Sequence, residues 1–119
     1  MEKETLVYDV RPISTIRELI ETSADEFKNR TAFVLKKDDK LYEKRYHEVM
    51  TEVKNFAAYL NAHGFEGKRV AVIGKNSYQW ALTYLAVTSG TGVIVPVDKD
   101  LKAPEITNIL RLSEAAAVV

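Results

Sequence analysis

The chain has 119 residues, enough for one domain that buries roughly two-thirds of the surface of its unfolded chain. Lys and Arg number 17 and Asp and Glu number 17, so the formal net charge is zero, which argues against the basic face that nucleic-acid binding requires. The absence of cysteine excludes disulfides, thiolate catalysis and cysteine-ligated metals. The first residues lack the apolar core of a signal peptide and no apolar run approaches a membrane span, so we expect a cytoplasmic location.

The N-terminal part predicts an arm followed by a helix. Residues 1–12 are mixed and charged, which indicates an extended arm. Thr15 with Glu18 has the capping-box pattern that opens a helix. Apolar residues then recur at helical spacing and predict the inner face of one amphipathic helix: Ile13, Ile16, Leu19, Ile20 and Phe27.

A hairpin and a second helix are expected next. Residues 32–36 and 41–46 read as strands joined by a polar turn at 37–40, and their charges suit a hairpin at the edge of a sheet. Gly64 stands where a left-handed residue would end the following helix. That helix carries one continuous apolar stripe: Val49, Val53, Phe56, Ala57 and Leu60.

The stretch from Arg69 to Asp98 is the centre of the predicted fold. Residues 70–73 and 93–97 are nearly continuous apolar runs, typical of parallel strands that helices cover on both faces. The segment from Tyr78 to about Ser89 is long enough for a crossover helix, so the unit predicts a right-handed βαβ arrangement. This helix is apolar on nearly every face, so either the sheet and its neighbours enclose it or part of it is covered by protein outside this chain.

The last part predicts one more helix and the start of another strand. Pro104 and Glu105 suit the first turn of a helix whose inner face is Ile106, Ile109 and Leu110. Residues 115–119 begin a third apolar run and then stop. We therefore expect an α/β fold: a mostly parallel sheet of βαβ units flanked by helices, with an N-terminal helix and an edge β-hairpin, forming a partial domain that is truncated at its C-terminal end.

Three glycine-containing loops are candidate phosphate sites. Residues 90–92 and 64–68 each precede a strand, so neither has the strand–turn–helix order of a phosphate-binding loop, and both read as turns. The loop Gly74 to Ser77 has the right order and its free N–H groups suit an anion, although Ser77 or Asn76 as a plain helix cap is favoured.

Other side chains give no catalytic constellation. His47 and His63 are too far apart along one helix to share a metal, and His63 is expected to stabilise the helix C-terminus. Asp98, at a strand's carboxyl end, is the most site-like carboxylate, but bracing the turn before Pro104 is the favoured role. Aromatic residues suit either a pocket or, more often, a core: Tyr78, Trp80 and Tyr84. The sequence predicts no catalytic, cofactor-binding or metal-ligating residue in this chain.

Five motifs, in order, resemble the N-terminal part of AMP-forming adenylating enzymes, which include acyl-CoA synthetases, luciferases and the adenylation domains of peptide synthetases. They are Tyr46–Val49, Arg69–Val72, Asn76–Trp80, Ser89–Asp98 and Pro104–Ile106, and residues 15–20 also match. The run from Val95 to Leu101 is similar to bacterial long-chain fatty-acid CoA ligases. Ala103 departs from the family, which commonly has threonine or serine before this proline, and the departure implies a lost helix cap of about 1 kcal/mol.

The resemblance implies that residues 13–119 are the N-terminal portion of a large adenylation domain. The parent would activate a fatty acid or other carboxylate with ATP and Mg²⁺ and transfer the acyl group to CoA. The family's phosphate loop, adenine and magnesium residues and lysine lid all lie beyond Val119 in such proteins, so this chain would be an inactive scaffold with no cofactor of its own. Its partner would be the remainder of the parent, and its open strand edge predicts self-association. The alternative is a stand-alone α/β binding or interaction module.

Overall fold

The computed structural model describes residues 8–119, apart from the side chain of Thr91. The first seven residues of the expected arm lie outside this range, and residues 8–12 have no regular secondary structure. Arg11 nonetheless ties the arm to the first helix, because it pairs with Glu26 and donates a hydrogen bond of 3.2 Å to the Ser23 hydroxyl.

Helix α1 (Ile16–Glu26) begins where the capping pattern predicted. The Thr15 hydroxyl accepts a hydrogen bond of 3.0 Å from the Glu18 N–H, which satisfies one of the unpaired donors of the first turn. The predicted inner face is only partly covered, because the buried residue of this helix is Ala24 whereas Ile13, Ile16 and Leu19 are exposed. Within residues 8–119 the helix packs chiefly on α2 and the segment after α3, which leaves its other side open.

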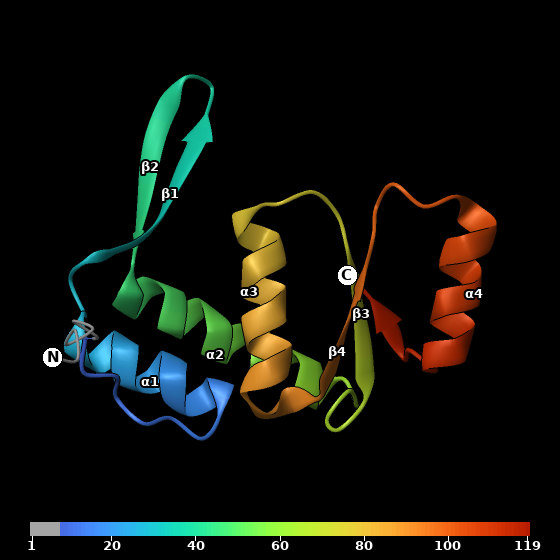
Figure 1. The fold of residues 1–119 in the computed structure, drawn as a ribbon, viewed down its shortest axis with the longest axis horizontal. Coiled ribbons are helices and arrows are strands. Elements are labelled where there is room, and N and C mark those ends of the chain that lie inside the picture. The colour runs from blue at the N-terminus through green and yellow to red at the C-terminus, as the bar shows by residue number, and fades with distance from the viewer. Residues whose placement is uncertain (1–7) are drawn as a thin grey trace, which may run out of the picture.

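Strands β1 (Thr31–Lys37) and β2 (Lys40–Arg45) form the predicted hairpin. Asp38 and Asp39 have φ of 51° and 58°, the left-handed pair that a two-residue turn between twisted strands requires. The hairpin forms a sheet of its own and does not pair with the parallel strands, so its placement at the edge of that sheet was wrong. Figure 1 shows it projecting away from the rest of the molecule, above α2.

Helix α2 (Tyr46–Ala62) buries Val49, Val53 and Leu60 from the predicted stripe. Gly64, at φ +83°, follows its last turn, and the Phe65 N–H donates to the Leu60 carbonyl at 3.0 Å. This left-handed ending returns the chain toward the sheet and satisfies carbonyls that the helix leaves unpaired.

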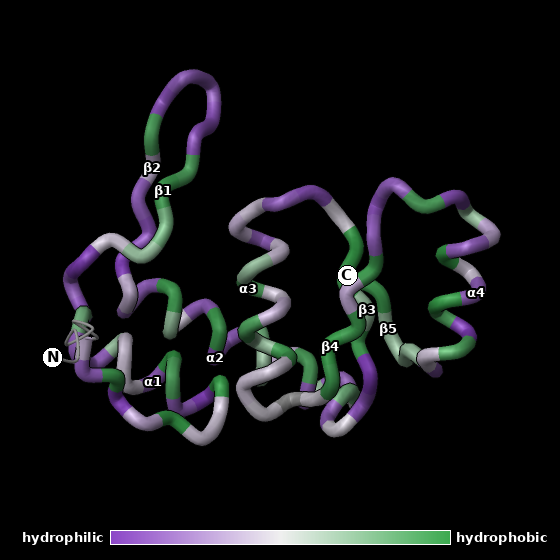
Figure 2. The backbone as a smooth tube through the Cα atoms, in the orientation of Figure 1, coloured by the Kyte–Doolittle hydropathy of each residue, from purple (hydrophilic) through white to green (hydrophobic). Residues whose placement is uncertain are grey.

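Strands β3 (Arg69–Ile73), β4 (Val93–Val97) and β5 (Ala117–Val118) form a parallel sheet in the order β4-β3-β5. Edge strand β4 tolerates Pro96, which has no N–H to donate. Helix α3 (Tyr78–Ala86) lies on one face of the sheet and helix α4 (Ala103–Ser113) on the other (Figure 1). The α/β class and the parallel sheet are therefore confirmed, and the apolar strands run through the middle of the molecule (Figure 2).

The crossover after β3 departs from the prediction in one detail. The α-helix ends at Ala86 rather than near Ser89, and the segment that follows, η1 (Val87–Thr91), is kinked, with non-helical backbone angles at Ser89 and Gly90. Gly90 in this segment has φ +125°, which favours glycine. Gly92 comes so close to β3's lead-in that a Cβ there would lie 2.1 Å from the Lys68 carbonyl oxygen, so only glycine fits.

The N-terminal cap of helix α4 differs from the prediction. The residue before its first turn is Lys102, so Ala103 is the first helical residue and not the cap. The Lys102 N–H is instead satisfied by the Glu105 carboxylate at 2.9 Å. The inner face predicted for this helix, Ile106, Ile109 and Leu110, is half-buried against β4.

The core lies mostly on the α3 side of the sheet. One cluster joins α2 and α3 through Val49, Val53, Tyr78 and Ala86, and Ala32, Phe33 and Leu35 of the hairpin pack against it. A second joins the end of α2 to the sheet through Leu60, Val70 and Val87. No helix in the described part of the chain is both long and apolar enough to span a membrane.

Candidate functional site

The candidate site lies where the carboxyl ends of β3 and β4 meet at one edge of the sheet. Parallel strands direct their carboxyl ends to the same edge, where α/β proteins commonly bind ligands. The loop 74–77 leads from β3 into α3, and the loop 98–102 leads from β4 toward α4. An open hollow of about 530 Å³ lies between the two loops, lined by Gly74, Lys75, Asn76, Trp80 and residues 96–100.

Ser77 has the helix-capping role that the sequence favoured. Its hydroxyl accepts a hydrogen bond of 3.2 Å from the Trp80 N–H, and its extended backbone marks it, rather than Asn76, as the cap of α3. This bond uses one of the N–H groups that an anion would need at the same helix end. The hydrogen bonding of this loop therefore serves the start of helix α3.

Asp98 has the turn-bracing role predicted for it. Its Oδ1 accepts a hydrogen bond of 2.9 Å from the Asp100 N–H, which closes a turn directly after β4. The Lys99 ammonium lies 2.6 Å from the Asp100 carboxylate and balances that charge. The carboxylates at this edge are thus engaged in shaping the loop.

The two histidines lie at opposite ends of α2 and do not meet. His63 Nδ1 lies 2.8 Å from the Tyr59 carbonyl oxygen, and the two rings stack at 4.0 Å, so His63 supports the end of the helix as expected. Among residues 8–119 no group of three or more acidic, histidine or cysteine side chains is placed to hold a metal ion. That this chain contributes no catalytic, cofactor-binding or metal-binding residue remains a prediction.

The three aromatic residues of α3 divide between core and surface. Tyr78 is buried in the first core cluster, where its ring meets Phe33 edge-on at 5.2 Å. Trp80 stacks on Tyr84 at 5.6 Å, and both rings are half-buried. Trp80 also lines the hollow between the loops, so one of the three aromatics faces the candidate site.

Sequence reasoning missed a polar cluster that joins the hairpin to both helices. The Lys44 ammonium on β2 lies 2.6 Å from Glu52 Oε1 on α2, and it sits 5.4 Å from the centre of the Tyr78 ring. The Tyr78 hydroxyl donates to the other oxygen of Glu52. These residues are up to 34 positions apart, and no local pattern links them.

The cluster fixes the charges of its members. Burial and the hydrogen bond to Glu52 raise the pKa of Tyr78 above its ordinary value of 10. Burial opposes ionisation of Glu52, but the hydrogen bonds from Lys44 and Tyr78 outweigh it and hold the Glu52 pKa below 4.5. At neutral pH the glutamate is therefore a stable acceptor and the phenol a stable donor. The arrangement is a structural link, with no base poised to activate a nucleophile.

Helices on both faces of a parallel sheet define the chain as an α/β protein. Residues 20–119 match the AMP-binding enzyme family, so the chain belongs to that family. This match confirms the resemblance that the ordered motifs indicated.

Three relatives give the scale of the similarity. The chain is 26% identical over 111 residues to the long-chain-fatty-acid–CoA ligase of Bacillus subtilis (strain 168), covering 91% of this chain and 19% of that ligase. It is 30% identical over 98 residues to the mitochondrial medium-chain acyl-CoA ligase ACSF2 of Rattus norvegicus, covering 82% of this chain and 16% of that protein. The solved N-terminal domain of FACL13 from Mycobacterium tuberculosis superposes with a TM-score of 0.81 at 25% identity, covering 89% of this chain and 26% of that one. The chain thus spans less than one fifth of the curated relatives it matches.

Proposed function

We propose that residues 13–119 are the N-terminal portion of the large adenylation domain of an ATP-dependent acyl-CoA synthetase. The observation that carries the proposal is the family match over residues 20–119, together with the shared fold of the FACL13 N-terminal domain. The ligases of Bacillus subtilis and Rattus norvegicus act on long-chain and medium-chain acyl substrates by name, which favours a fatty acid as the carboxylate.

The reaction proposed for the longer protein has two steps. The carboxylate oxygen of the acid attacks the α-phosphorus of ATP, which forms an acyl-adenylate and releases pyrophosphate. The thiol of CoA then attacks the acyl carbon, loses its proton and displaces AMP, which leaves a thioester.

The residues described here do not fit a site for ATP with Mg²⁺. The first turn of α3 is already capped by Ser77, the carboxylates of the loop after β4 are engaged in the turn, and no three-ligand group for a metal is present among residues 8–119. We therefore assign ATP, Mg²⁺ and CoA binding to protein outside this chain. Residues 8–119 supply scaffold: three parallel strands, four α-helices and a hairpin.

A segment exchange tests this role. In the Bacillus subtilis ligase, the segment aligned with this chain is replaced by residues 13–119, and fatty-acid-dependent ATP–pyrophosphate exchange and acyl-CoA formation are measured. We expect the folded chimera to retain both activities, with the unmodified ligase prepared in parallel as control. A chimera that is folded by circular dichroism and monodisperse but inactive in both assays would count against the scaffold role.

The isolated chain provides the complementary measurement. We expect no ATP–pyrophosphate exchange with any fatty acid, because the chemistry is assigned to residues elsewhere. ATP–pyrophosphate exchange that stays with the purified chain, and is lost when the chain is removed from the sample, would overturn the inactive-scaffold part of the proposal. The family membership would remain intact.

A further inference from the structure

The hairpin leaves one edge of β1 without a strand partner. Residues that flank a two-residue turn form a hydrogen-bonded pair, and pairing then alternates along an antiparallel ladder. From the register Lys37↔Lys40, Leu35↔Tyr42 and Phe33↔Lys44, the backbone N–H and C=O groups of Val34 and Lys36 therefore point away from β2.

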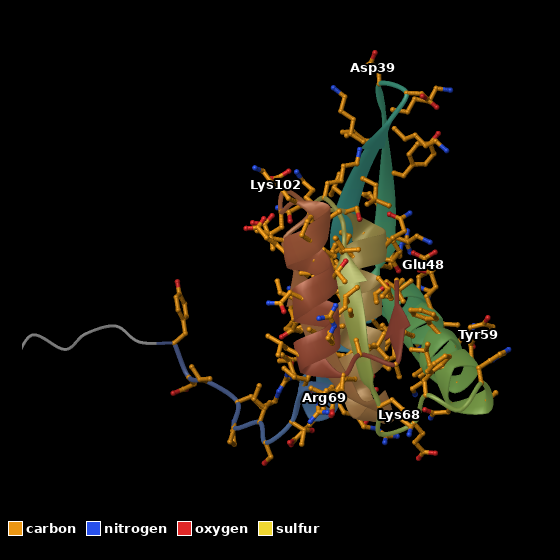
Figure 3. The ribbon with its side chains drawn as sticks, turned by 90° about the vertical axis from the view of Figure 1, so that its right-hand side faces the viewer. Asp39, Glu48, Tyr59, Lys68, Arg69 and Lys102 are labelled. Atoms are coloured by element: carbon orange, nitrogen blue, oxygen red, sulfur yellow. The ribbon has the colours of Figure 1, made fainter. Side chains whose placement is uncertain are left out.

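No other strand among residues 8–119 pairs with this edge, since β1 bonds only to β2. The hairpin projects away from the parallel sheet in Figure 1. In Figure 3 its tip, labelled at Asp39, is the part of the hairpin farthest from the helices. A two-stranded hairpin is marginally stable on its own in water. Its exposed apolar residues include Val34 at 58% and Leu41 at 70%.

A long groove follows the open edge of β1. Its volume is about 950 Å³. One wall is the continuous run 33–38 of β1 and its turn, with Tyr42 and Lys44 of β2 beside it. The opposite wall is formed by residues 75–79, at and just before the start of α3. Phe33, Leu35 and Tyr78 give the groove apolar surface. The edge-on contact of Phe33 with Tyr78 and the Lys44–Glu52 pair anchor the hairpin base beside it.

The charge lining this groove is one-sided although the whole chain is neutral. Four lysines line it, Lys36, Lys37, Lys44 and Lys75, against one carboxylate, Asp38. Lys36 pairs with Asp39 at 3.4 Å and Lys44 with Glu52. Lys37 and Lys75 form no ion pair with any residue in the described range, so one uncompensated cation stands on each wall.

We propose that the outer edge of β1 is a docking site for an extended, acidic polypeptide segment from outside this chain, which adds to the hairpin as a third strand. The backbone groups of Val34 and Lys36 supply the ladder, alternate apolar side chains of the segment contact Phe33 and Leu35, and its carboxylates meet Lys37 and Lys75. This is strand addition, in which main-chain bonds give affinity and side-chain contacts give specificity. A second copy of the chain fits less well, because it would bring the same lysines to the groove. The proposal is independent of the adenylation reaction.

The test uses the 119-residue chain and the capped peptide Glu-Thr-Glu-Thr-Val-Thr-Val-Thr, in which every second side chain faces the groove. Paired antiparallel to β1, its valines lie beside Phe33 and Leu35 and its glutamates point toward Lys37 and Lys75. We expect binding in a titration followed by NMR, weakened by added salt, and no binding of the matched peptide Lys-Thr-Lys-Thr-Val-Thr-Val-Thr. Val34→Pro removes one outward N–H without touching the ladder to β2, so we expect binding to weaken at least about fivefold, the equivalent of one unmade hydrogen bond. Leu41→Pro makes the same change on the opposite edge of the hairpin and is expected to leave binding unchanged.

Hydrogen exchange locates the bound strand. We expect the amides of Val34 and Lys36 to become protected when the acidic peptide is added, and the double variant Lys37→Glu with Lys75→Glu to lose that protection. Failure of the peptide to bind, equal loss in the two proline variants, or protection confined to β4 or β5 would each overturn the proposal. A dimer of the free chain that Val34→Pro dissociates would assign the edge to a second copy instead. Two-dimensional NMR spectra of each variant establish that the remaining fold is intact.

Discussion

The parallel sheet and the hairpin are both built from short strands, but they are held in different ways. In the sheet, central strand β3 is covered by helices and its residues Val70, Ala71 and Val72 are buried. The hairpin touches the rest of the chain mainly through its base, where Phe33 packs on Tyr78 and Lys44 pairs with Glu52. Apolar burial stabilises without regard to direction, whereas a polar link fixes an orientation at modest energy. The sheet therefore sets the stability of the fold, and the cluster of Lys44, Glu52 and Tyr78 sets where the hairpin stands.

The largest effect is expected from Gly92→Ala, which introduces a steric clash beside the parallel sheet. The added methyl would lie 2.1 Å from the Lys68 carbonyl oxygen, so the backbone of β4 or of the loop before β3 must move. We expect the free energy of unfolding to fall by about 3 kcal/mol, measured by urea denaturation. Gly67→Ala is the control, because its methyl meets nothing within 4 Å and only the left-handed φ of +71° opposes it, at about 1 kcal/mol. Equal losses in the two variants would show that the close approach at Gly92 is not what demands glycine.

A matched pair of valine truncations compares the two regions directly. Val70 on β3 is 0% exposed, so Val70→Ala should cost about 2.5 kcal/mol through lost burial and the cavity left behind. Val34 on β1 is 58% exposed, and Val34→Ala should cost less than about 0.5 kcal/mol. The measurement is again the urea unfolding curve. A large loss for Val34→Ala would mean that the hairpin contributes to the core more than its exposure indicates.

Glu52→Gln tests the link between hairpin and helices. The amide keeps an oxygen that accepts from Tyr78 but loses the ion pair with Lys44, and because both partners are about one-third exposed we expect a cost of about 1 kcal/mol. Amide exchange within β1 and β2 should accelerate more than exchange within β3. Asp39→Asn is the control, since it removes the exposed pair with Lys36 at the hairpin tip and should cost less than about 0.5 kcal/mol. If exchange in β3 accelerates as much as in the hairpin, the cluster belongs to the core rather than to the hairpin alone.

The smallest effect is the pH dependence of the same cluster. The pKa of Glu52 is lowered by folding, so its contribution is present above pH 4.5 and is lost as the pH falls below that value. The pKa of Tyr78 is raised by folding, so its contribution is present below pH 10 and is lost as the pH rises above 10. Tyr78→Phe should abolish the alkaline loss and reduce the acid loss, as followed by the urea midpoint against pH. An alkaline loss that persists unchanged in Tyr78→Phe would assign it to another group.

The sequence by itself determined the local elements, because their signals lie within a few residues of one another. Thr15 and Ser77 cap the helices that follow them, the stripe of α2 faces the core, and Asp98 braces its turn, all as predicted. The apolar runs at β3 and β4 also gave the parallel sheet, since strands buried on both faces need no polar alternation. The ordered motifs led to the AMP-binding enzyme family, which the match over residues 20–119 confirmed.

Tertiary structure alone decided how these elements meet. The hairpin was expected at the edge of the parallel sheet, but it forms a separate sheet, because its position depends on contacts of β2 and β1 with α2 and α3 rather than on its own residues. The polar cluster joins Lys44, Glu52 and Tyr78 across three elements, and no spacing of residues in the sequence predicts it. The requirement for glycine at position 92 comes from the Lys68 carbonyl, 24 residues earlier in the chain. Hydrogen-bonding patterns and periodicity act over short separations, whereas packing and charge pairing join residues that the chain itself keeps apart.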